Sequence, residues 1–218
     1  MIKPYYQGNG VTIYHGDCRD ILPELEVADV IITDPVWPNN NGLFDGSDRP
    51  FDLLGEAARY FPEIASRLVL ILGCGSDPRF LLGVPREYKF LRVCWLQYVV
   101  PNYVGRLMNT SDIAYVFGEW PRSKPGARVL PGQHLAIRPD KKYRGHPSPR
   151  KLEHMRWLVN WFSEGMIIDP FMGSGTTLRA AQECGWPAVG IEIKEEYCKL
   201  AVKRCREPIM DLRLGRTK

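Results

Sequence analysis

Four short strand-like runs in the sequence each end at, or within two residues of, an acidic side chain. Segments with helical spacing follow them, and strands that alternate with helices predict a layered α/β fold with a mostly parallel sheet. The continuous apolar run at 29–33 is typical of a strand buried on both faces. The runs and their acids are 11–15 with Asp17, 29–33 with Asp34, 166–168 with Asp169, and 188–191 with Glu192.

Further segments complete the expected fold, which we expect to be a single domain over residues 1–218. The runs 68–72, 91–100 and 113–117 predict strands, and the last two could pair antiparallel at an edge of the sheet. Helices or helical turns are expected over 19–25, 51–65, 152–162, 176–184 and 194–205.

The four acids together predict a shared site. Ligands of open α/β sheets bind outside the carboxyl ends of the strands, where all four acids would lie. A single acid at such a position is as often a helix cap or a surface charge. Four acids in equivalent positions are much harder to explain as structural residues.

A glycine-rich turn, Gly173-Ser174-Gly175, follows the third of these acids. Glycine has no Cβ, so the backbone of such a turn can approach a ligand closely. The turn lacks the lysine of a Walker loop and the G-x-G-x-x-G spacing of a dinucleotide site. Glu192 stands one strand later, where an acid commonly holds ribose hydroxyls. The pattern therefore favours a nucleoside cofactor without a polyphosphate.

Five stretches of the sequence resemble motifs of the amino-DNA methyltransferases, which use S-adenosylmethionine. Their order, with the catalytic motif first and the cofactor loop last, is similar to that of the circularly permuted β-type subgroup. The resemblance implies a Rossmann-like class I methyltransferase sheet, mostly parallel with an antiparallel edge hairpin, and double-stranded DNA as substrate. The stretches are HGDCRDILPEL, TDPVW, HPSPRKLEHMRWLV, DPFMGSGTT and GIEIKEEYCKLAVKR.

The resemblance implies a cofactor site residue by residue. Asp17 and the Cys18 backbone would lie beside the adenine, and Glu192 would hold the ribose hydroxyls. The glycine turn would frame the methionine end, with the H-P-x-x-K-P-like stretch packed beside it. The other expected cofactor residues are Asp34, His146, Ser148, Asp169, Phe171, Gly173, Ser174, Gly175, Thr176 and Thr177.

The stretch TDPVW supplies the expected catalytic residues Asp34, Pro35 and Trp37. An exocyclic amino nitrogen is a poor nucleophile because its lone pair is delocalised into the base. Asp34 and the Pro35 carbonyl could accept its N–H groups and stabilise the positive charge of the transition state. The base must first be flipped out of the duplex, and stacking on Trp37 would stabilise it by about 1–3 kcal/mol. As structural residues, Asp34 would form an Asx-turn and Trp37 would belong to the core.

Two motifs depart from the family pattern. Val36 and Trp37 replace the second proline and the tyrosine of D-P-P-Y, and Arg150 and Lys151 replace the lysine and final proline of H-P-x-x-K-P. These departures leave open a catalytically silent DNA-binding protein with the same fold. Within the class, cytosine-N4 methylation is the alternative. The family's cytosine enzymes commonly carry serine in place of Asp34, so the aspartate favours adenine N6. An RNA or small-molecule methyltransferase is a weaker third hypothesis.

A basic, proline-rich segment lies where the β-type family carries its target-recognition region. Residues 119–156 hold ten Lys/Arg against three acids, a charge of +7, which leaves −3 for the rest of a chain with net charge +4. Such a segment suits either a polyanion-facing surface or a solvated loop. We expect 119–145 to be a short recognition insertion. The candidate DNA-binding residues are Asn39, Asn40, Arg122, Lys124, Arg128, Arg138, Lys141, Lys142 and Arg144.

The remaining composition argues against other classes. No apolar run reaches the ~20 residues of a membrane span, and no apolar signal core is visible, so a cytoplasmic protein is expected. The six cysteines form no C-x-x-C pair, so no metal site is expected. The sequence leaves open whether a homodimer grips the duplex and whether a cognate restriction enzyme exists.

Overall fold

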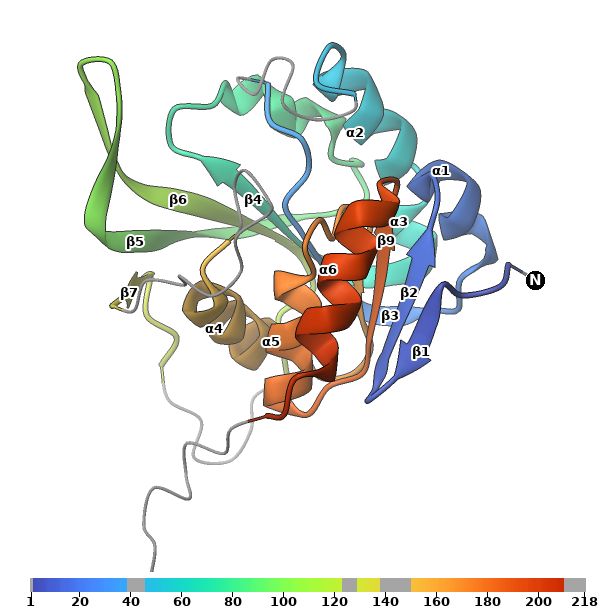
Figure 1. Cartoon of the computed structure of the whole chain (residues 1–218). Helices are drawn as coiled ribbons and strands as arrows, with labels where there is room; N and C mark the ends of the chain where they lie inside the picture. The colour runs from blue at the N-terminus through green and yellow to red at the C-terminus, as the bar shows by residue number, and fades with distance from the viewer. Residues whose placement is uncertain (1, 39–45, 123–128, 138–149, 210–218) are drawn as a thin grey trace, which may run out of the picture.

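The computed structural model describes residues 2–38, 46–122, 129–137 and 150–209, which form a nine-stranded sheet with helices on both faces (Figure 1). The strand order is β1-β2-β9-β8-β3-β4-β6-β5-β7. In this described part, β1 and β6 run against their neighbours and the other strands run in one direction. The strands are β1 (Tyr6–Gly8), β2 (Val11–His15), β3 (Ala28–Thr33), β4 (Ala65–Gly73), β5 (Phe90–Val104), β6 (Leu107–Gly118), β7 (Gln133–Ala136), β8 (Ile167–Asp169) and β9 (Ala188–Glu192).

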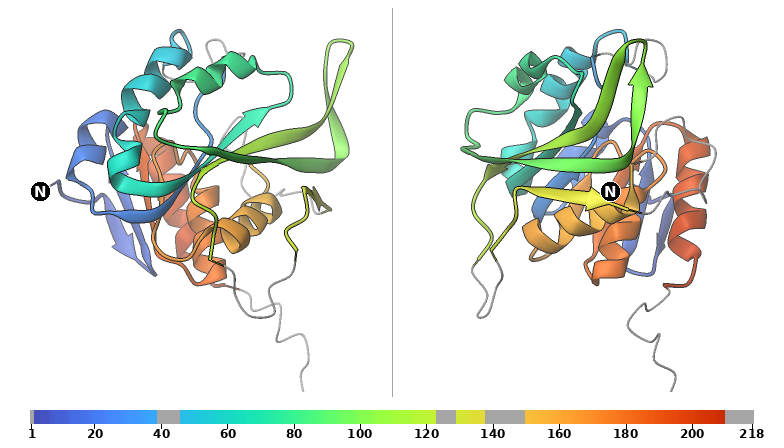
Figure 2. Two further views of the ribbon diagram at one scale, coloured as in Figure 1. Left: turned by 180° about the vertical axis from the view of Figure 1, so that it is seen from behind. Right: turned by 90° about the vertical axis from the view of Figure 1, so that its left-hand side faces the viewer.

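Two sets of helices enclose the sheet (Figures 1 and 2). On one face, α2 and α3 pack over one cluster of buried side chains. On the other face, α4, α5 and α6 pack over a second cluster. None of the described helices is long and apolar enough to cross a membrane. The helices are α1 (Cys18–Ile21), η1 (Leu22–Glu24), α2 (Pro50–Ala58), α3 (Phe61–Ile64), η2 (Pro78–Gly83), α4 (Leu152–Phe162), α5 (Thr176–Cys184) and α6 (Glu195–Arg206).

The core is divided into two layers by the alternation of side chains along the central strands. Val30 and Ile32 of β3 belong to the layer of α4 and α5, whereas Ile31 belongs to the layer of α2 and α3. All three side chains are fully buried. Successive residues of a strand point to opposite faces, so a continuous apolar run is stable only where helices cover both faces. The prediction of a buried, mostly parallel sheet is confirmed.

The strand order brings together the four strands that precede the acids. β2, β9, β8 and β3 are consecutive and parallel, with His15 opposite Glu192 and Ile31 opposite Ile168. Their carboxyl ends therefore meet at one edge of the sheet. The segments that supply this edge lie far apart in the sequence, near residues 15, 33, 169 and 192.

Three segments differ from the sequence-based expectation. The helix expected over 51–65 is two helices, because Pro62 occupies the first turn of α3, and Ala65 already belongs to β4. The basic segment 119–145 contains β7, which pairs in parallel with β5 beyond the expected edge hairpin. The hairpin of β5 and β6 pairs antiparallel as predicted, but it is longer and extends past the end of β4 (Figure 2).

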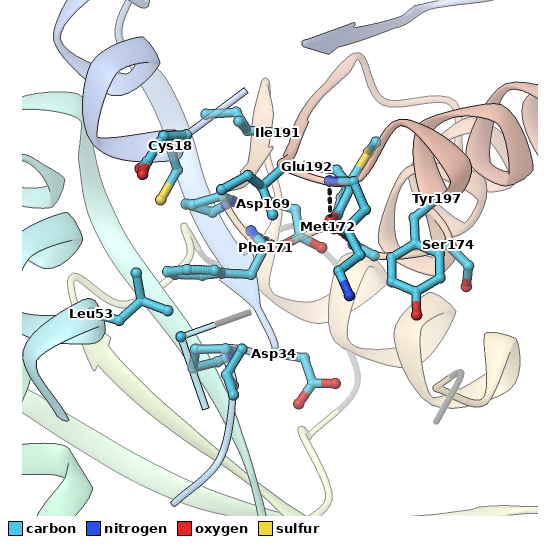
Figure 3. A pocket seen from close by; sticks show the side chains of 18 of the residues that line it. Cys18, Asp34, Leu53, Asp169, Phe171, Met172, Ser174, Ile191, Glu192 and Tyr197 are labelled. Atoms are coloured by element: carbon cyan, nitrogen blue, oxygen red, sulfur yellow. Dashed lines mark hydrogen bonds between the residues drawn. The ribbon is translucent and has the colours of Figure 1, made fainter. Parts of the chain in front are cut away.

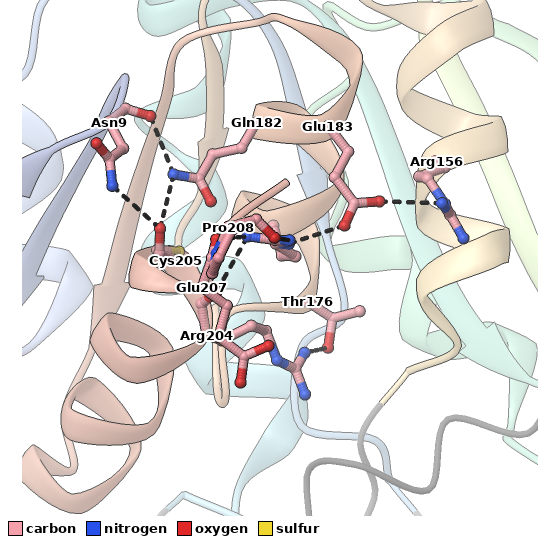
Figure 4. A network of polar contacts seen from close by, with 10 residues as sticks. Asn9, Arg156, Thr176, Gln182, Glu183, Arg204, Cys205, Glu207 and Pro208 are labelled. Carbon is pink, nitrogen blue, oxygen red and sulfur yellow. Dashed lines mark hydrogen bonds and ion pairs between the residues drawn. The ribbon is translucent and has the colours of Figure 1, made fainter. Parts of the chain in front are cut away.

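Helices α5 and α6 are joined by buried polar contacts (Figure 4). Arg179 of α5 donates to the backbone oxygens of Glu207 and Pro208, at 2.7 and 3.0 Å, beyond the end of α6. Arg204 of α6 is 1% exposed and donates to the Thr176 hydroxyl at the start of α5. Hydrogen bonds of charged donors are stronger than those of neutral donors. These arginines therefore fix α5, and the glycine turn that precedes it, relative to α6.

Candidate active site

A cavity of about 400 Å³ opens at the carboxyl edge of β2, β9, β8 and β3, and all four strand-terminal acids line it. The side chains of Cys18, Leu53 and Phe171 face the same space (Figure 3). Apolar walls with a few polar groups at fixed positions are typical of small-molecule sites. The candidate residues that line the cavity are Asp17, Cys18, Asp34, Pro35, Trp37, Asp169, Phe171, Gly173, Ser174, Thr176, Thr177 and Glu192.

Gly175 is the residue of the glycine turn that lies outside the cavity lining. Its φ is +76°, and a Cβ placed on it would lie 2.7 Å from the Cβ of Ala201 in α6. The residue therefore allows the turn to pack against α6. The structure gives Gly175 a packing role, and the cofactor contact expected from the sequence stays a prediction.

Glu192 is held by backbone N–H groups on both carboxylate oxygens. Gly173 N donates to Oε2 at 3.0 Å and Lys194 N donates to Oε1 at 2.9 Å. Burial raises the pKa of this carboxyl, and the backbone donors oppose the rise. Each carboxylate oxygen keeps a further lone pair, so the acid can still accept hydrogen bonds from a ligand's hydroxyl groups.

Asp169 is 2% exposed, at the junction of β8 and the glycine turn. Its Oδ1 accepts from the Thr33 hydroxyl at 2.8 Å and from Phe171 N at 3.2 Å. Burial raises the pKa of this carboxyl to about 7, although the hydroxyls of Thr177 and Thr33 favour its charged form. The charged form of Asp169 is therefore unfavourable in this site, and a cationic ligand would stabilise that form.

The raised pKa of Asp169 makes a prediction about stability and pH. Its folded pKa, about 7, lies above the ordinary value of 3.8, so folding takes up a proton between these values and stability falls as the pH rises from about 4 to 7. Asp169→Asn removes this loss. We expect the variant to unfold at a higher temperature than wild type at pH 8, with a gain of about 1–3 kcal/mol, below the ~4 kcal/mol that three pKa units represent.

Thermal unfolding at pH 5 and pH 8 measures this effect. The gain should shrink towards pH 5, where wild-type Asp169 is protonated. Asp17→Asn is the control of opposite sign, because hydrogen bonds from Arg19 lower the pKa of Asp17. That variant should be less stable than wild type by the same amount at pH 5 and pH 8, because a carboxyl with a lowered pKa stays charged at both. A constant difference between Asp169→Asn and wild type at every pH would contradict the assignment.

Asp17 caps helix α1 and anchors an arginine at the rim of the cavity. It accepts from Arg19 N and from Arg19 Nε, both at 2.9 Å, and the same guanidinium is ion-paired to Glu56 of α2. The arginine neutralises Asp17 and ties α1 to α2. The sequence analysis identified Asp17 but missed Arg19 and Glu56. Arg19 belongs to the same motif as Asp17, whereas Glu56 belongs to α2, outside that motif.

Asp34 directly follows β3, and its side chain is 19% exposed. Its Oδ2 accepts from Arg150 Nε at 2.5 Å, whereas its buried Oδ1 has no hydrogen-bond partner among the described residues. Burial raises the pKa of this carboxyl to about 6, the Arg150 charge opposes the rise, and the Asp112 charge adds to it. A buried oxygen without a donor is costly, and this one belongs to a residue that lines the cavity, so a bound ligand could supply the donor.

Trp37 is fixed by the end of β4. Its Nε1 donates to Ile71 O at 3.2 Å, and a Cβ at Gly73 would lie 2.4 Å from the indole. The Arg150 guanidinium carbon lies 4.2 Å from the centre of the ring. One face of the indole, the ring on which a base was expected to stack, is therefore covered by an arginine in this structure.

Arg150 is the start of a buried polar chain that sequence reasoning missed. Its Nη1 donates to Asp112 Oδ2 at 2.5 Å, and the same oxygen accepts from the Tyr98 hydroxyl. Burial raises the pKa of Tyr98, so this hydroxyl stays protonated and remains a donor. Asp112 and Tyr98 belong to the β5–β6 hairpin, outside every recognised motif. The sequence offered one signal for this contact, which was Asp112 as an acid beside the apolar residues of β6.

Arg122 lies away from the cavity. Its backbone N–H donates to Glu164 Oε1 at 2.9 Å, and Glu164 is ion-paired to Arg67 near the start of β4. This is the amino-end edge of the parallel strands, opposite the cavity, and it does not support the expected DNA contact of Arg122. The remaining candidates, Asn39, Asn40, Lys124, Arg128, Arg138, Lys141, Lys142, Arg144, His146 and Ser148, lie outside the described residues.

Comparison with known proteins gives related sequences. A family profile described as DNA methylase matches residues 95–203. The type II methyltransferase M.ScaI of Streptomyces caespitosus is 55% identical over 271 aligned positions, which cover 93% of this chain and 83% of that protein. Several other curated methyltransferases match over less than a third of their own length.

Solved structures with similar folds include two DNA methyltransferases. The cytosine-N4-specific PvuII DNA methyltransferase has a TM-score of 0.76 at 16% identity, over 96% of this chain and 91% of that chain. M1.HpyAVI in complex with S-adenosylmethionine has a TM-score of 0.71 at 24% identity, over 90% of this chain and 100% of that chain. At these identities, the two likenesses show a shared fold.

Proposed function

This chain belongs to the DNA methylase family, and on that basis we propose that it transfers the methyl group of S-adenosylmethionine to an exocyclic amino nitrogen of a base in double-stranded DNA. The observation that supports the proposal most directly is Asp34, which lines the same cavity as the cofactor-type acids and whose buried Oδ1 has no donor among the described residues. This carboxylate would accept an N–H from the target amino group.

The acidic side chains of the cavity fit S-adenosylmethionine. Asp169 and Glu192 are carboxyls whose pKa is raised mainly by burial, so a bound cation would stabilise their charged forms. The cofactor carries a sulfonium and an ammonium group. Glu192, at the end of β9, would accept from the ribose hydroxyls, as such acids do in related nucleotide sites. Phe171, Leu53 and Cys18 would enclose the adenine.

The protein would contribute alignment and electrostatics to the transfer. S-adenosylmethionine, when bound, supplies an electrophilic methyl group. Asp34 and the Pro35 carbonyl would accept the two N–H groups of the target amine, so that its lone pair is free to attack and the growing positive charge is stabilised. Pro35 and Pro38 restrict the loop, which keeps these acceptors in a fixed geometry.

The face around the cavity would receive the DNA. β7 ends at Ala136 on the cavity side of the sheet, and the described chain resumes at Arg150 inside the cavity. The candidate phosphate contacts Arg138, Lys141, Lys142 and Arg144 lie in the sequence between these two points, outside the described residues. Contacts of such basic side chains with phosphates would make binding depend on salt.

For the target base, we propose adenine N6, because the family's cytosine enzymes commonly carry serine where this chain has Asp34. Cytosine N4 is the second candidate. Asp34 Oδ2 is engaged by Arg150, so the residue offers one oxygen to a ligand, as a serine would.

A product analysis tests the function and separates the two bases. The protein is incubated with duplex DNA and S-adenosylmethionine labelled on the methyl group, and the DNA is digested to nucleosides for mass spectrometry. We expect label in N6-methyladenine. Label in N4-methylcytosine would support the second candidate. Preference for RNA or free nucleosides, or DNA binding without any transfer, would contradict the proposal.

A further inference from the structure

Arg150 lies inside the cavity, and its contacts are those expected of a flipped base. The guanidinium is planar and carries N–H donors, as the amino edge of adenine or cytosine does. It donates to Asp34 and lies over Trp37, which are the residues proposed to hold the target. Its side chain is 14% exposed, whereas an arginine that contacts DNA phosphates is expected to be exposed on the surface.

We infer that Arg150 occupies the place of the target base in the DNA-free protein and gives up its contact with Asp34 when the base enters. This inference rests on the proposed function, because it names the residue that the target must displace. The guanidinium and a stacked base cannot share one face of the indole. Access to Asp34 is therefore a competition between an internal ligand and the DNA.

Asp112 makes this displacement feasible. It is 6% exposed, accepts from Arg150 at 2.5 Å, and is held in place by the Tyr98 hydroxyl. An arginine that leaves Asp34 can remain paired with Asp112, so the guanidinium keeps a charged partner, while the entering base supplies N–H donors to Asp34. The contact with Asp112 would act as the pivot, and the contact with Asp34 would be the one that exchanges.

The same contact gives Arg150 a second effect, on the charge of Asp34. The groups that face Asp34 are Arg150, Asp112 of β6, Tyr98 of β5 and Asp169 of β8. His154 and Lys151 lie on the far side of Asp112 and Tyr98, on or next to α4. Without Arg150, Asp34 would face two other acids, and its pKa would rise by about one unit or more. Arg150 thus keeps the acceptor charged until the base arrives.

The experiment compares Arg150→Met with wild type in steady-state methylation of duplex DNA from pH 6 to pH 9 and at several salt concentrations. Arg150→Lys keeps the charge but lacks the planar fork. Arg156→Met is the matched control, because this arginine on α4 is paired with Glu183 and lies outside the cavity lining. Wild-type transfer is measured first, so a failure of the proposed function is seen before any variant is compared.

We expect Arg150→Met to lower the KM for DNA at pH 8.5 by about threefold or more, because the competent state no longer excludes the base. The acidic limb of its pH profile should move up by about one unit, whereas Arg150→Lys should keep the wild-type limb. Arg156→Met should change neither. Direct titration of deoxyadenosine and deoxycytidine should show tighter binding to Arg150→Met, and this readout does not require turnover.

Two results would overturn the inference. A higher KM for Arg150→Met, with a salt dependence reduced by about one phosphate contact, would make Arg150 a DNA-backbone ligand. An equal loss of kcat at every pH, with nucleoside affinity unchanged, would make it a structural residue. Absence of transfer by wild type, together with tighter nucleoside binding by Arg150→Met, would remove the proposed function but keep the competition.

Discussion

Asp34→Ala lowers the rate of methyl transfer by at least about 10²–10³-fold, the usual effect of removing a preorganised group that stabilises transition-state charge. Its carboxylate is the buried acceptor at the end of β3, beside the cofactor-type acids. Cofactor affinity should stay close to wild type, because the proposed ribose and adenine contacts come from Glu192, Asp17 and Cys18. Single-turnover transfer and calorimetric titration of S-adenosylmethionine measure the two quantities separately.

Two further variants sharpen this result. Asp34→Asn keeps the shape but removes the charge that pairs with Arg150, and it should lose nearly as much activity as alanine. Asp20→Ala removes an exposed carboxylate from α1, outside the cavity lining, and should leave the rate unchanged. If Asp34→Ala retains wild-type turnover, the amine is activated by another group and the catalytic assignment fails.

Gly175→Ala destabilises the fold by about 2–4 kcal/mol, since a left-handed φ disfavours a side chain and overpacking adds to that cost. The new Cβ would meet Ala201 Cβ at 2.7 Å and Ala201 Cα at 3.1 Å. Helices α5 and α6 are tied together by Arg179 and Arg204, so they cannot easily separate to make room. In a chain of this length we expect the melting temperature to fall by about 5–15 °C.

Gly185 offers a matched control for this change. Its φ is +80°, but a Cβ there would have no atom within 4 Å. Gly185→Ala should therefore show the conformational cost alone, and the difference between the two variants measures the packing cost. Gly175→Ala combined with Ala201→Gly should recover much of that difference. Equal melting temperatures for Gly175→Ala and Gly185→Ala would show that α6 shifts to accommodate the new Cβ. The close packing at Gly175 would then contribute nothing measurable to stability.

The sequence predicted the sheet and the acids of the site well, for physical reasons. Continuous apolar runs, strand-terminal acids and the glycine turn are local patterns, and the alternation of strands with helices predicts a mostly parallel sheet. Asp17, Asp34, Asp169 and Glu192 could therefore be assigned to one cavity before the structure was known. The division of α2 from α3 was missed because helical spacing continues across Pro62.

The part that could not be predicted depends on contacts between distant elements. Asp112 and Tyr98 lie on a hairpin whose place beside the cavity is set by pairing with β4, and no local pattern announces their contact with Arg150. Trp37 was expected to present a free face, but its surroundings include a strand end and an arginine more than a hundred residues away. The close packing of Gly175 against Ala201 of α6 likewise joins two elements that no local pattern connects.

The contact between Trp37 and Gly73 couples two positions that no motif joins. A ring of this size at position 37 leaves no room for even a methyl group at position 73. A substitution that adds a side chain at the end of β4 therefore requires a smaller or displaced side chain at position 37. The tryptophan of D-P-V-W and this glycine thus form one steric unit, although they lie 36 positions apart in the sequence.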